Sequence, residues 1–495
     1  MVKLFADKNM KVGKVNPKLY SSFVEHVGRC VYTGIYEPGH PTADENGFRG
    51  DVLELVKQLQ VQMVRYPGGN FLSGYDWKDG IGPKGKRPTR PDIAWQTTEP
   101  NQFGTDEFMD WCEKTGIEPM MAVNMGTGTP KDAAELVEYC NHSGGTYFSE
   151  LRKANGHEKP YAVETWCIGN EMDGPWQICG LDAEDYAKKA LQAARMMKGI
   201  DPGLKLVACG SSSAEMVTYP EWDRIVLDHL YDEVDYISMH RYYWDEGNRN
   251  DFFASYYDMD AFIKTIRAAA DYVKAKHRSK KVMGISFDEW NVWYQNAQGK
   301  ANWAAKPKIL EDVYSLKDAL VFAGMMTTLL NNCDRVQIAC LAQLVNAIGP
   351  IFTKEGGEAI KQTTYFPFEM FSVFGRGDVM NAIVTCDAFE SKFGDVPYVA
   401  ASVVENTVQN KISVFLINYS DSVMPYEMEL RSFGGLKPLD AVVMDGTDLE
   451  ARNTFDTPEA VKPRKGDLPA MKKEIAGGSL PACSFTMLRF SKELS

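Results

Sequence analysis

Two glutamates, Glu171 and Glu289, have the sequence context of catalytic carboxylates. Each ends an apolar segment, AVETWCIGNE or KVMGISFDE, and each is followed by a tryptophan, Trp176 or Trp290. A carboxylate at the end of a buried strand costs free energy unless something there uses it. Two carboxyl groups that face one cavity can hydrolyse a glycoside: a protonated one gives its proton to the leaving oxygen, and an ionised one attacks the sugar or activates water. The chemistry requires a fold that brings both groups to one cavity.

Further polar residues lie at or just past the ends of the apolar segments of the chain. They are Glu25, His26, Asn70, Asn124, Asn170, Ser211, His240, Tyr242, Asp288 and Gln343. Each has an ordinary structural alternative: Asn70 follows Pro-Gly-Gly and suits a turn, Tyr242 suits a core aromatic, and Gln343 could satisfy backbone groups at a strand end. The seven histidines have no metal-ligand spacing, so we predict hydrogen-bonded roles for His26 and His240 and no metal site.

Eight short apolar segments alternate with longer segments of helical period. The apolar segments cover residues 20–26, 61–69, 118–126, 162–171, 204–212, 234–243, 281–290 and 336–344. The clearest helical segments cover residues 105–116, 130–141, 183–201 and 259–277, with suitable start and stop residues. Eight such units favour a closed (β/α)8 TIM barrel, with an open doubly wound sheet as the alternative. In a barrel the carboxyl ends of all strands meet at one face, where the polar residues would form one site.

The sequence pattern changes after about residue 375. Short runs with turns between them and no convincing helix cover residues 382–389, 398–406, 411–420, 426–433, 439–445 and 484–492. These runs predict an all-β domain and favour a sandwich. We therefore expect a catalytic barrel over residues 16–375 and a C-terminal β-sandwich over residues 376–495, which residues 1–15 join with a strand.

Composition and charge exclude several classes of protein. With Lys+Arg 54 against Asp+Glu 67, the formal net charge is −13, which excludes a basic surface for nucleic acid or for an anionic membrane. No stretch approaches the roughly 18 uninterrupted apolar residues of a membrane helix. The N-terminus MVKLFADKNMKVGKV lacks the apolar segment of a secretory signal, and the ten cysteines contain no C-x-x-C pair. We therefore expect a cytoplasmic protein with buried thiols.

Five motifs together resemble the α-L-arabinofuranosidases of glycoside hydrolase family 51. They are FVEHVGRCVYTGIYEPGHP, VRYPGGNFLSGYDW, CIGNEMDGPWQ, ISFDEWNVWY and AQLVNAIGPI, in the order of the family. The resemblance covers nearly the whole predicted barrel and continues more weakly into the C-terminal domain. It implies a retaining exo-hydrolase with a (β/α)8 barrel, a jelly-roll-like sandwich and no cofactor. A homo-oligomer, a hexamer as is common in the family, is also implied.

The resemblance further implies roles for single residues. Glu171 would be the acid/base and Glu289 the nucleophile. The residues that would bind the furanose are Glu25, Asn70, Asn170, Tyr242 and Gln343, and Trp95, in IAWQTTEPNQFG, would help to wall the pocket. The implied substrates are arabinose-containing oligosaccharides derived from arabinan or arabinoxylan. The alternatives are another retaining barrel glycosidase, such as a β-xylosidase or an endoglucanase, or a non-catalytic carbohydrate-binding protein.

Overall fold

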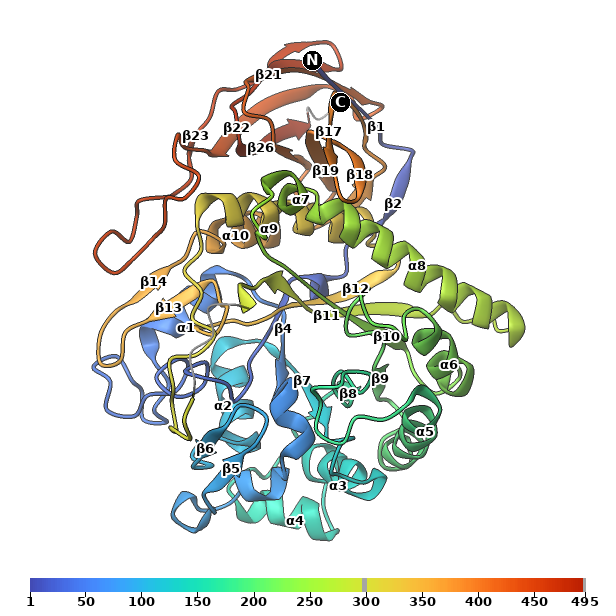
Figure 1. The fold of residues 1–495 in the computed structure, drawn as a ribbon, viewed down its shortest axis with the longest axis vertical. Coiled ribbons are helices and arrows are strands. Elements are labelled where there is room, and N and C mark those ends of the chain that lie inside the picture. Colours follow the sequence, from blue (N-terminus) through green and yellow to red (C-terminus); the bar gives the residue numbers. More distant parts are fainter. Residues whose placement is uncertain (296–300, 493–495) are drawn as a thin grey trace.

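The centre of the molecule is a closed barrel of eight parallel strands (Figure 1). The structure, a computed structural model, describes residues 1–295 and 301–492. The barrel strands are β3 (Ser21–Phe23), β4 (Met63–Tyr66), β7 (Glu118–Val123), β8 (Thr165–Ile168), β9 (Lys205–Ala208), β10 (Tyr236–Tyr243), β11 (Gly284–Val292) and β12 (Val336–Leu341). Each coincides with one of the eight apolar segments, and β12 pairs with β3 to close the ring. The barrel prediction is therefore confirmed, and the open-sheet alternative is wrong.

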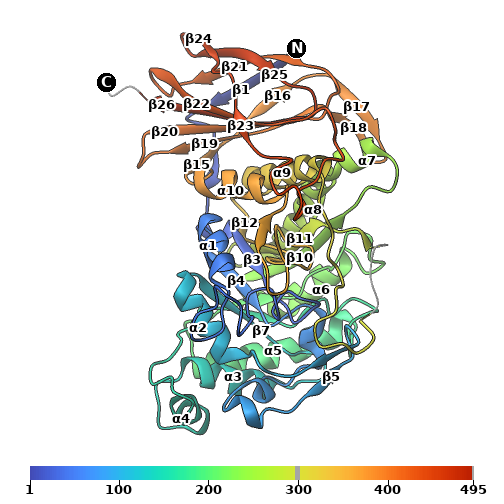
Figure 2. The ribbon, with the colours of Figure 1, turned by 90° about the vertical axis from the view of Figure 1, so that its left-hand side faces the viewer.

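Helices surround the barrel. They are α1 (Gly50–Gln58), α2 (Thr105–Thr115), α3 (Pro130–Asn141), α4 (Tyr147–Ala154), α5 (Ala183–Ile200), α6 (Glu221–Leu230), α7 (Arg249–Phe253), α8 (Ser255–Lys276), α9 (Leu316–Asn331) and α10 (Tyr365–Phe374). The four predicted helices are α2, α3, α5 and α8. Almost every residue of α9 is buried because this helix lies between the barrel and the C-terminal sheets (Figure 2), so its sequence is apolar all round.

Two sheets form the C-terminal β-sandwich. One has the order β16-β1-β21-β25-β24, and the other has the order β2-β15-β19-β20-β26-β22-β23. Their strands are β1 (Val2–Asp7), β2 (Lys11–Lys14), β15 (Asp378–Met380), β16 (Ile383–Thr385), β19 (Val399–Asn406), β20 (Lys411–Asn418), β21 (Met424–Arg431), β22 (Leu436–Met444), β23 (Arg464–Lys465), β24 (Ala470–Lys472), β25 (Ile475–Leu480) and β26 (Ser484–Lys492). The N-terminal residues thus supply one strand to each sheet. Figure 2 shows the seven-stranded sheet between the other sheet and helices α9 and α10.

Several short strands escaped the sequence analysis. Three hairpins are β5–β6 (Arg90–Asp92, Thr97–Glu99), β13–β14 (Ile351–Thr353, Ala359–Lys361) and β17–β18 (Ala388–Ser391, Gly394–Pro397). Of these six strands only β17 overlaps a predicted run, at the last two residues of 382–389. Strands β15, β23, β24 and β25 were also missed. β25 has the sequence IAGGSL, and its two glycines give no apolar alternation, so its pairing depends on the neighbouring strands β21 and β24 rather than on local preference.

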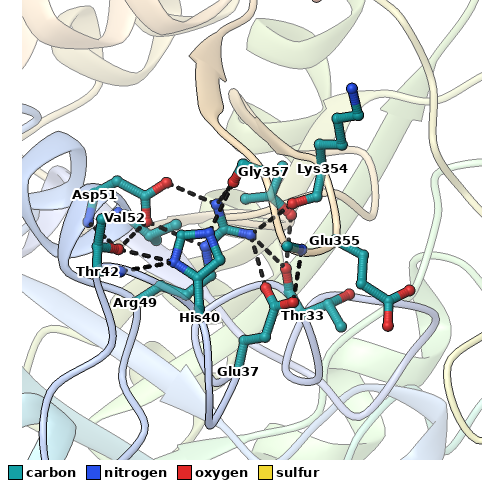
Figure 3. A network of polar contacts seen from close by, with 12 residues as sticks. Thr33, Glu37, His40, Thr42, Arg49, Asp51, Val52, Lys354, Glu355 and Gly357 are labelled. Atoms are coloured by element: carbon teal, nitrogen blue, oxygen red, sulfur yellow. Dashed lines mark hydrogen bonds and ion pairs between the residues drawn. The ribbon is translucent and has the colours of Figure 1, made fainter.

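A buried arginine joins the loops that follow the first and last barrel strands (Figure 3). Arg49, fully buried, donates two hydrogen bonds to Asp51 at 3.1 and 2.6 Å and one to Glu37 at 2.9 Å. It also donates to the carbonyl oxygens of Lys354 at 2.9 Å and Gly357 at 2.6 Å, at the tip of the β13–β14 hairpin. These contacts reinforce the closure of the barrel, because β12 and β3 pair over only two residue positions.

Within residues 1–295 and 301–492, no helix combines the length and the apolar character that a membrane span requires. All ten cysteines lie in this described part of the chain and are free thiols, and eight of them are buried. The eight buried cysteines therefore contribute to apolar packing, as the sequence predicted.

Candidate active site

The polar residues at the strand ends meet at one face of the barrel. Glu25 follows β3, Asn70 begins the short helix after β4, Asn170 and Glu171 follow β8, Tyr242 lies in β10, Glu289 lies in β11, and Gln343 follows β12. Their side chains form two hydrogen-bonded groups, one around the pair Glu171 and Glu289 and one around Glu25. The arrangement is that of a barrel active site.

Glu171 and Glu289 face each other closely. A carboxylate oxygen of each and a ring nitrogen of His240 all lie within 4.8 Å of one another. Both glutamates are buried, with 9% and 5% of their surface exposed. Glu289 is held at both oxygens, because Tyr242 donates its hydroxyl to Oε2 at 2.8 Å and Arg65 donates Nη1 to Oε1 at 2.7 Å. These two donors fix the orientation of the Glu289 carboxyl group.

Glu171 has different partners. His240 donates Nδ1 to its Oε1 at 2.9 Å, and Trp176 donates its indole Nε1 to Oε2 at 2.7 Å. Trp176 is 49% exposed, so it lies where this carboxyl group approaches solvent. The backbone turns sharply here, with φ of +96° at Gly169 and +44° at Glu171. A non-glycine residue in this region is uncommon and requires support from its surroundings.

Three buried residues that received no catalytic or binding role from the sequence support the pair. They are Arg65, His240 and Asp288. Arg65, in β4, donates Nη2 to Asn170 at 2.6 Å, and its Nε lies 3.8 Å from Asp288. Asp288 also accepts a hydrogen bond from His240 Nε2 at 3.1 Å. In the sequence, the arginine inside the apolar segment MVRY could have indicated this charged cluster, because a buried guanidinium requires anionic partners.

The charges of this group balance when one carboxyl group keeps its proton. Burial alone would lower the pKa of His240, but the charge of Glu289 and hydrogen bonds to Asp288 and Glu171 raise it to about 10. Burial also opposes the ionisation of Asp288, yet Arg65 and His240 hold its pKa below the ordinary value. The two cations of this cluster, Arg65 and protonated His240, therefore face three carboxyl groups, those of Glu171, Glu289 and Asp288. A single proton on one of these carboxyl groups makes the cluster neutral.

The same protonation state argues against a metal ligand at His240. His240, Glu171 and Glu289 are close enough together to surround an ion. A metal ligand needs a free lone pair on the ring, whereas both nitrogens of a protonated imidazole are donors. Nδ1 faces Glu171 and Nε2 faces Asp288, so both protons of His240 have acceptors.

The second group surrounds Glu25. Its Oε1 accepts hydrogen bonds from the Phe71 amide at 3.0 Å and the Trp95 indole at 2.8 Å, and its Oε2 accepts one from the Gln343 amide at 3.0 Å. A Cβ atom at Gly69 would lie 2.3 Å from Oε2, so only glycine fits beside this carboxyl group. Burial raises the pKa of Glu25 to about 8, although the Phe71 and Trp95 bonds oppose the change. At neutral pH Glu25 therefore carries a proton that it can donate.

Asn170 connects Arg65, and through it Glu289, to Asn70. Its Oδ1 accepts from Arg65, and its Nδ2 lies 3.5 Å from Asn70 Oδ1. The arginine thus fixes the orientation of the amide and leaves the Nδ2 group directed toward the loop after β4. An amide in this position can donate to a sugar hydroxyl.

Comparisons with known proteins agree with this geometry. The "Alpha-L-arabinofuranosidase 1 domain" family matches residues 55–256, and the "Alpha-L-arabinofuranosidase C-terminal domain" family matches residues 288–484. The chain is 47% identical to the intracellular exo-α-(1→5)-L-arabinofuranosidase of Halalkalibacterium halodurans and 45% identical to one from Bacillus subtilis, and each alignment covers 99% of both chains. A solved family 51 α-L-arabinofuranosidase from Bifidobacterium longum has a TM-score of 0.95 and 43% identity over 99% of both chains. The chain belongs to family 51.

Membership of family 51 confirms the resemblance seen in the motifs. The protein is a glycoside hydrolase of the α-L-arabinofuranosidase type, and the β-xylosidase, endoglucanase and non-catalytic alternatives are disfavoured. A second solved relative, the arabinose complex of an α-L-arabinofuranosidase from Thermotoga maritima, has a TM-score of 0.89 and 34% identity over 99% of both chains. The family 51 fold thus extends over the barrel and the sandwich alike.

Proposed function

We propose that this family 51 enzyme is an exo-acting, retaining α-L-arabinofuranosidase in which Glu171 is the acid/base and Glu289 the nucleophile. The separation of the two carboxyl groups is the observation that carries this proposal, because their oxygens lie within 4.8 Å. Retaining glycosidases place the two groups about 5–5.5 Å apart, whereas inverting enzymes leave about 6.5–9.5 Å for a water molecule.

In the first step Glu289 attacks the anomeric carbon. The bond from that carbon to the leaving oxygen breaks while Glu171 transfers its proton to this oxygen, and a β-linked arabinofuranosyl ester forms on Glu289. Arg65 and Tyr242 orient the attacking carboxylate through their hydrogen bonds to its two oxygens. These contacts support Glu289 as the nucleophile and Glu171 as the adjacent acid.

In the second step Glu171 acts as a base. Formation of the ester removes the charge of Glu289, and Glu171 has already lost its proton. Glu171 takes a proton from water while the water oxygen attacks the anomeric carbon, which releases α-arabinose and regenerates both side chains. The hydrogen bonds from His240 and Trp176 hold the Glu171 carboxyl group in place during this step.

The remaining predicted residues are proposed to bind the furanose. Glu25, protonated at neutral pH, donates to a sugar hydroxyl, while Gln343 and Trp95 fix its carboxyl group. Asn170 donates to the 2-hydroxyl, an interaction that strengthens as positive charge develops on the ring. Asn70 lies beside it. Several polar contacts to one terminal sugar suit exo action.

The substrates proposed are oligosaccharides from arabinan or arabinoxylan with a terminal α-L-arabinofuranosyl residue. Relatives carry the names exo-α-(1→5)-L-arabinofuranosidase and, at 47% identity in Bifidobacterium longum, exo-α-(1→6)-L-arabinofuranosidase. A panel of α-1,2, α-1,3, α-1,5 and α-1,6 linked oligosaccharides would identify the preferred linkage. Since several relatives are named intracellular, we also propose a cytoplasmic location. The hexamer remains a prediction that light scattering can check.

Stereochemistry tests the proposed mechanism directly. Proton NMR during hydrolysis of an aryl α-L-arabinofuranoside should show the α-anomer of arabinose as the first product. A β-anomer formed first would mean inversion and would make Glu289 a base acting through water. Glu289→Ala should abolish turnover of every substrate, including those with activated leaving groups, because the first step loses its nucleophile. Glu54→Ala, at an exposed position on α1, is the control and should keep full activity.

A further inference from the structure

The hairpin that carries Trp95 meets the loop after β3 at two points. Trp95 lies in the turn between β5 and β6 and donates its indole Nε1 to Glu25 at 2.8 Å. Glu99 ends β6 and is buried, with 5% of its surface exposed. Its Oε2 lies 2.9 Å from Nδ1 of His26, the residue that follows Glu25 in the chain. The contact between Glu99 and His26 thus bridges the same two segments as the hydrogen bond between Trp95 and Glu25.

The other oxygen of Glu99 is also fixed. Its Oε1 accepts hydrogen bonds from the hydroxyl of Tyr32, in the loop after β3, and from the backbone amide of Asn101 at 2.6 Å. Asn101 has φ of +53°, a left-handed conformation in which asparagine is enriched. A buried carboxyl group costs free energy unless donors surround it. These donors offset that cost, and they fix the end of the hairpin to the loop that carries Glu25.

His26 supports a second donor of Glu25. Its ring stacks on Phe71 with ring centroids 4.8 Å apart, and its Nε2 forms a hydrogen bond with the Tyr66 hydroxyl of β4 at 2.8 Å. Phe71 donates its backbone amide to Glu25 at 3.0 Å. Two of the three donors to Glu25 described above, at Phe71 and in the hairpin, therefore lie on segments that His26 contacts.

The internal shape of the hairpin has a separate origin. Asp92, in β5, accepts hydrogen bonds from the backbone amides of Ala94 at 2.9 Å and Trp95 at 3.3 Å and from the Thr97 hydroxyl at 3.0 Å. These bonds stay within the hairpin and shape its turn. Glu99 instead links the hairpin to the loop after β3, so it helps to fix where the indole lies relative to the carboxyl group that it binds.

We infer that Glu99 is a positioning residue for the furanose site: through its contacts with Tyr32 and His26 it places the Trp95 indole on Glu25 and so orients the carboxyl group that binds the sugar. The inference rests on the sugar-binding role proposed for Glu25. Because Glu99 acts through Trp95, its effect on the reaction should disappear when the indole donor is absent.

The test is a double-mutant cycle between Glu99→Gln and Trp95→Phe, measured with an aryl α-L-arabinofuranoside. Glutamine has the size of glutamate but offers one acceptor oxygen and one NH2 donor, so it cannot present an oxygen on both sides. Phenylalanine removes the indole donor. Each single variant should lower kcat/KM about fivefold, as expected for one lost hydrogen bond. The double variant should lie within about twofold of Trp95→Phe alone, because the two residues act as one unit.

The kinetic constants separate positioning from a loss of folded enzyme. Less folded enzyme lowers kcat and leaves KM unchanged, whereas a displaced sugar-binding group raises KM. The loss in Glu99→Gln should therefore lie mainly in KM.

Two further variants complete the design. Tyr32→Phe keeps the ring but removes the hydroxyl that donates to Glu99, so it should raise KM by less and show the same dependence on Trp95. It tests the inference even if Glu99→Gln does not fold. The matched control is Glu113→Gln, at an exposed position on α2, which should leave kcat and KM unchanged with either residue at position 95.

Three results would overturn the inference. They are effects of Glu99→Gln and Trp95→Phe that multiply in the double variant, a loss confined to kcat, and a Trp95→Phe variant with the kcat/KM of wild type. Each of these would leave the proposed roles of Glu171 and Glu289 intact. Failure of wild type to hydrolyse any arabinofuranoside would instead remove the proposed function, and this inference with it.

Discussion

Glu171 and Glu289 have different hydrogen-bond partners, and this difference predicts different consequences of their loss. Glu171→Ala removes the proposed proton donor, so hydrolysis of substrates with poor leaving groups should fall by about 10²–10⁴-fold. Activated aryl arabinofuranosides should lose much less in the first step. Added azide should restore turnover and yield the β-arabinofuranosyl azide, because a small anion can replace the water that Glu171 activates. Equal losses on both substrate types without an azide product would exclude this role.

Glu25 allows a test of pH dependence that needs no substrate. The unfolded chain releases the Glu25 proton near its ordinary pKa of 4.5 and the folded chain near pH 8. The stability from this proton is therefore complete below about pH 4.5 and is lost as the pH rises toward 8. Glu25→Gln removes the titration while keeping a similar shape.

The free energy of unfolding, measured in urea at pH 5, 6.5 and 8, should thus fall more steeply with pH in wild type than in Glu25→Gln. The difference in slope cannot exceed about 1.4 kcal/mol per pH unit for one proton. Parallel pH dependences for the two proteins would show that Glu25 titrates alike in the folded and unfolded chain.

Elements were easier to predict from the sequence than the contacts between them. Barrel strands such as β8, with the sequence TWCI, are buried throughout and appear in the sequence as continuous apolar runs. In helices such as α5, the apolar residues recur with the helical period. The role of Arg65 could not be predicted in this way, because its partners Glu289 and Asn170 lie far away in the sequence. Glu99 and His26 present the same difficulty. Local patterns identify which residues end a strand, whereas pairing across the barrel depends on its closure.

The β13–β14 hairpin offers a prediction at the level of elements. Arg49→Met should destabilise the protein by about 3–5 kcal/mol, because Asp51 and Glu37 lose a fully buried cation and the hairpin tip loses the donor to Lys354 and Gly357. Arg49→Lys should not restore stability, since one ammonium group cannot serve all these acceptors. Hydrogen exchange should report faster opening of residues 351–361.

The matched control for this experiment is Arg90→Met. Arg90 is exposed and pairs with Asp79 at the surface, where an ion pair contributes little. Its loss should leave the unfolding transition and the exchange of residues 351–361 unchanged. If Arg49→Met behaves like this control, the contacts of Figure 3 do not hold the hairpin.

At the scale of the whole molecule, one apolar core joins the barrel and its helices to one face of the sandwich. Phe371 of α10 stacks on Phe415 of β20 with ring centroids 4.2 Å apart and on Phe485 of β26 at 5.3 Å. Along β20, Phe415 and Ile417 face the helices, whereas Val414 packs in the core between the two sheets. The seven-stranded sheet therefore has two apolar faces. Separating this sheet from helices α9 and α10 would expose apolar surface of both to water, which costs free energy.

This shared core predicts that the two parts unfold together. All ten tryptophans lie between Trp77 and Trp303, in the barrel, so their fluorescence reports barrel unfolding alone, while hydrogen exchange of peptides from residues 399–418 reports the sandwich. In urea, at one protein concentration, both probes should give the same midpoint. Phe415→Ala should move both midpoints down together, by about 3–5 kcal/mol in the free energy of unfolding. If exchange in the sandwich preceded the fluorescence change, the sandwich would be an independently unfolding domain, and the Phe371 contacts would contribute little to the stability of the barrel.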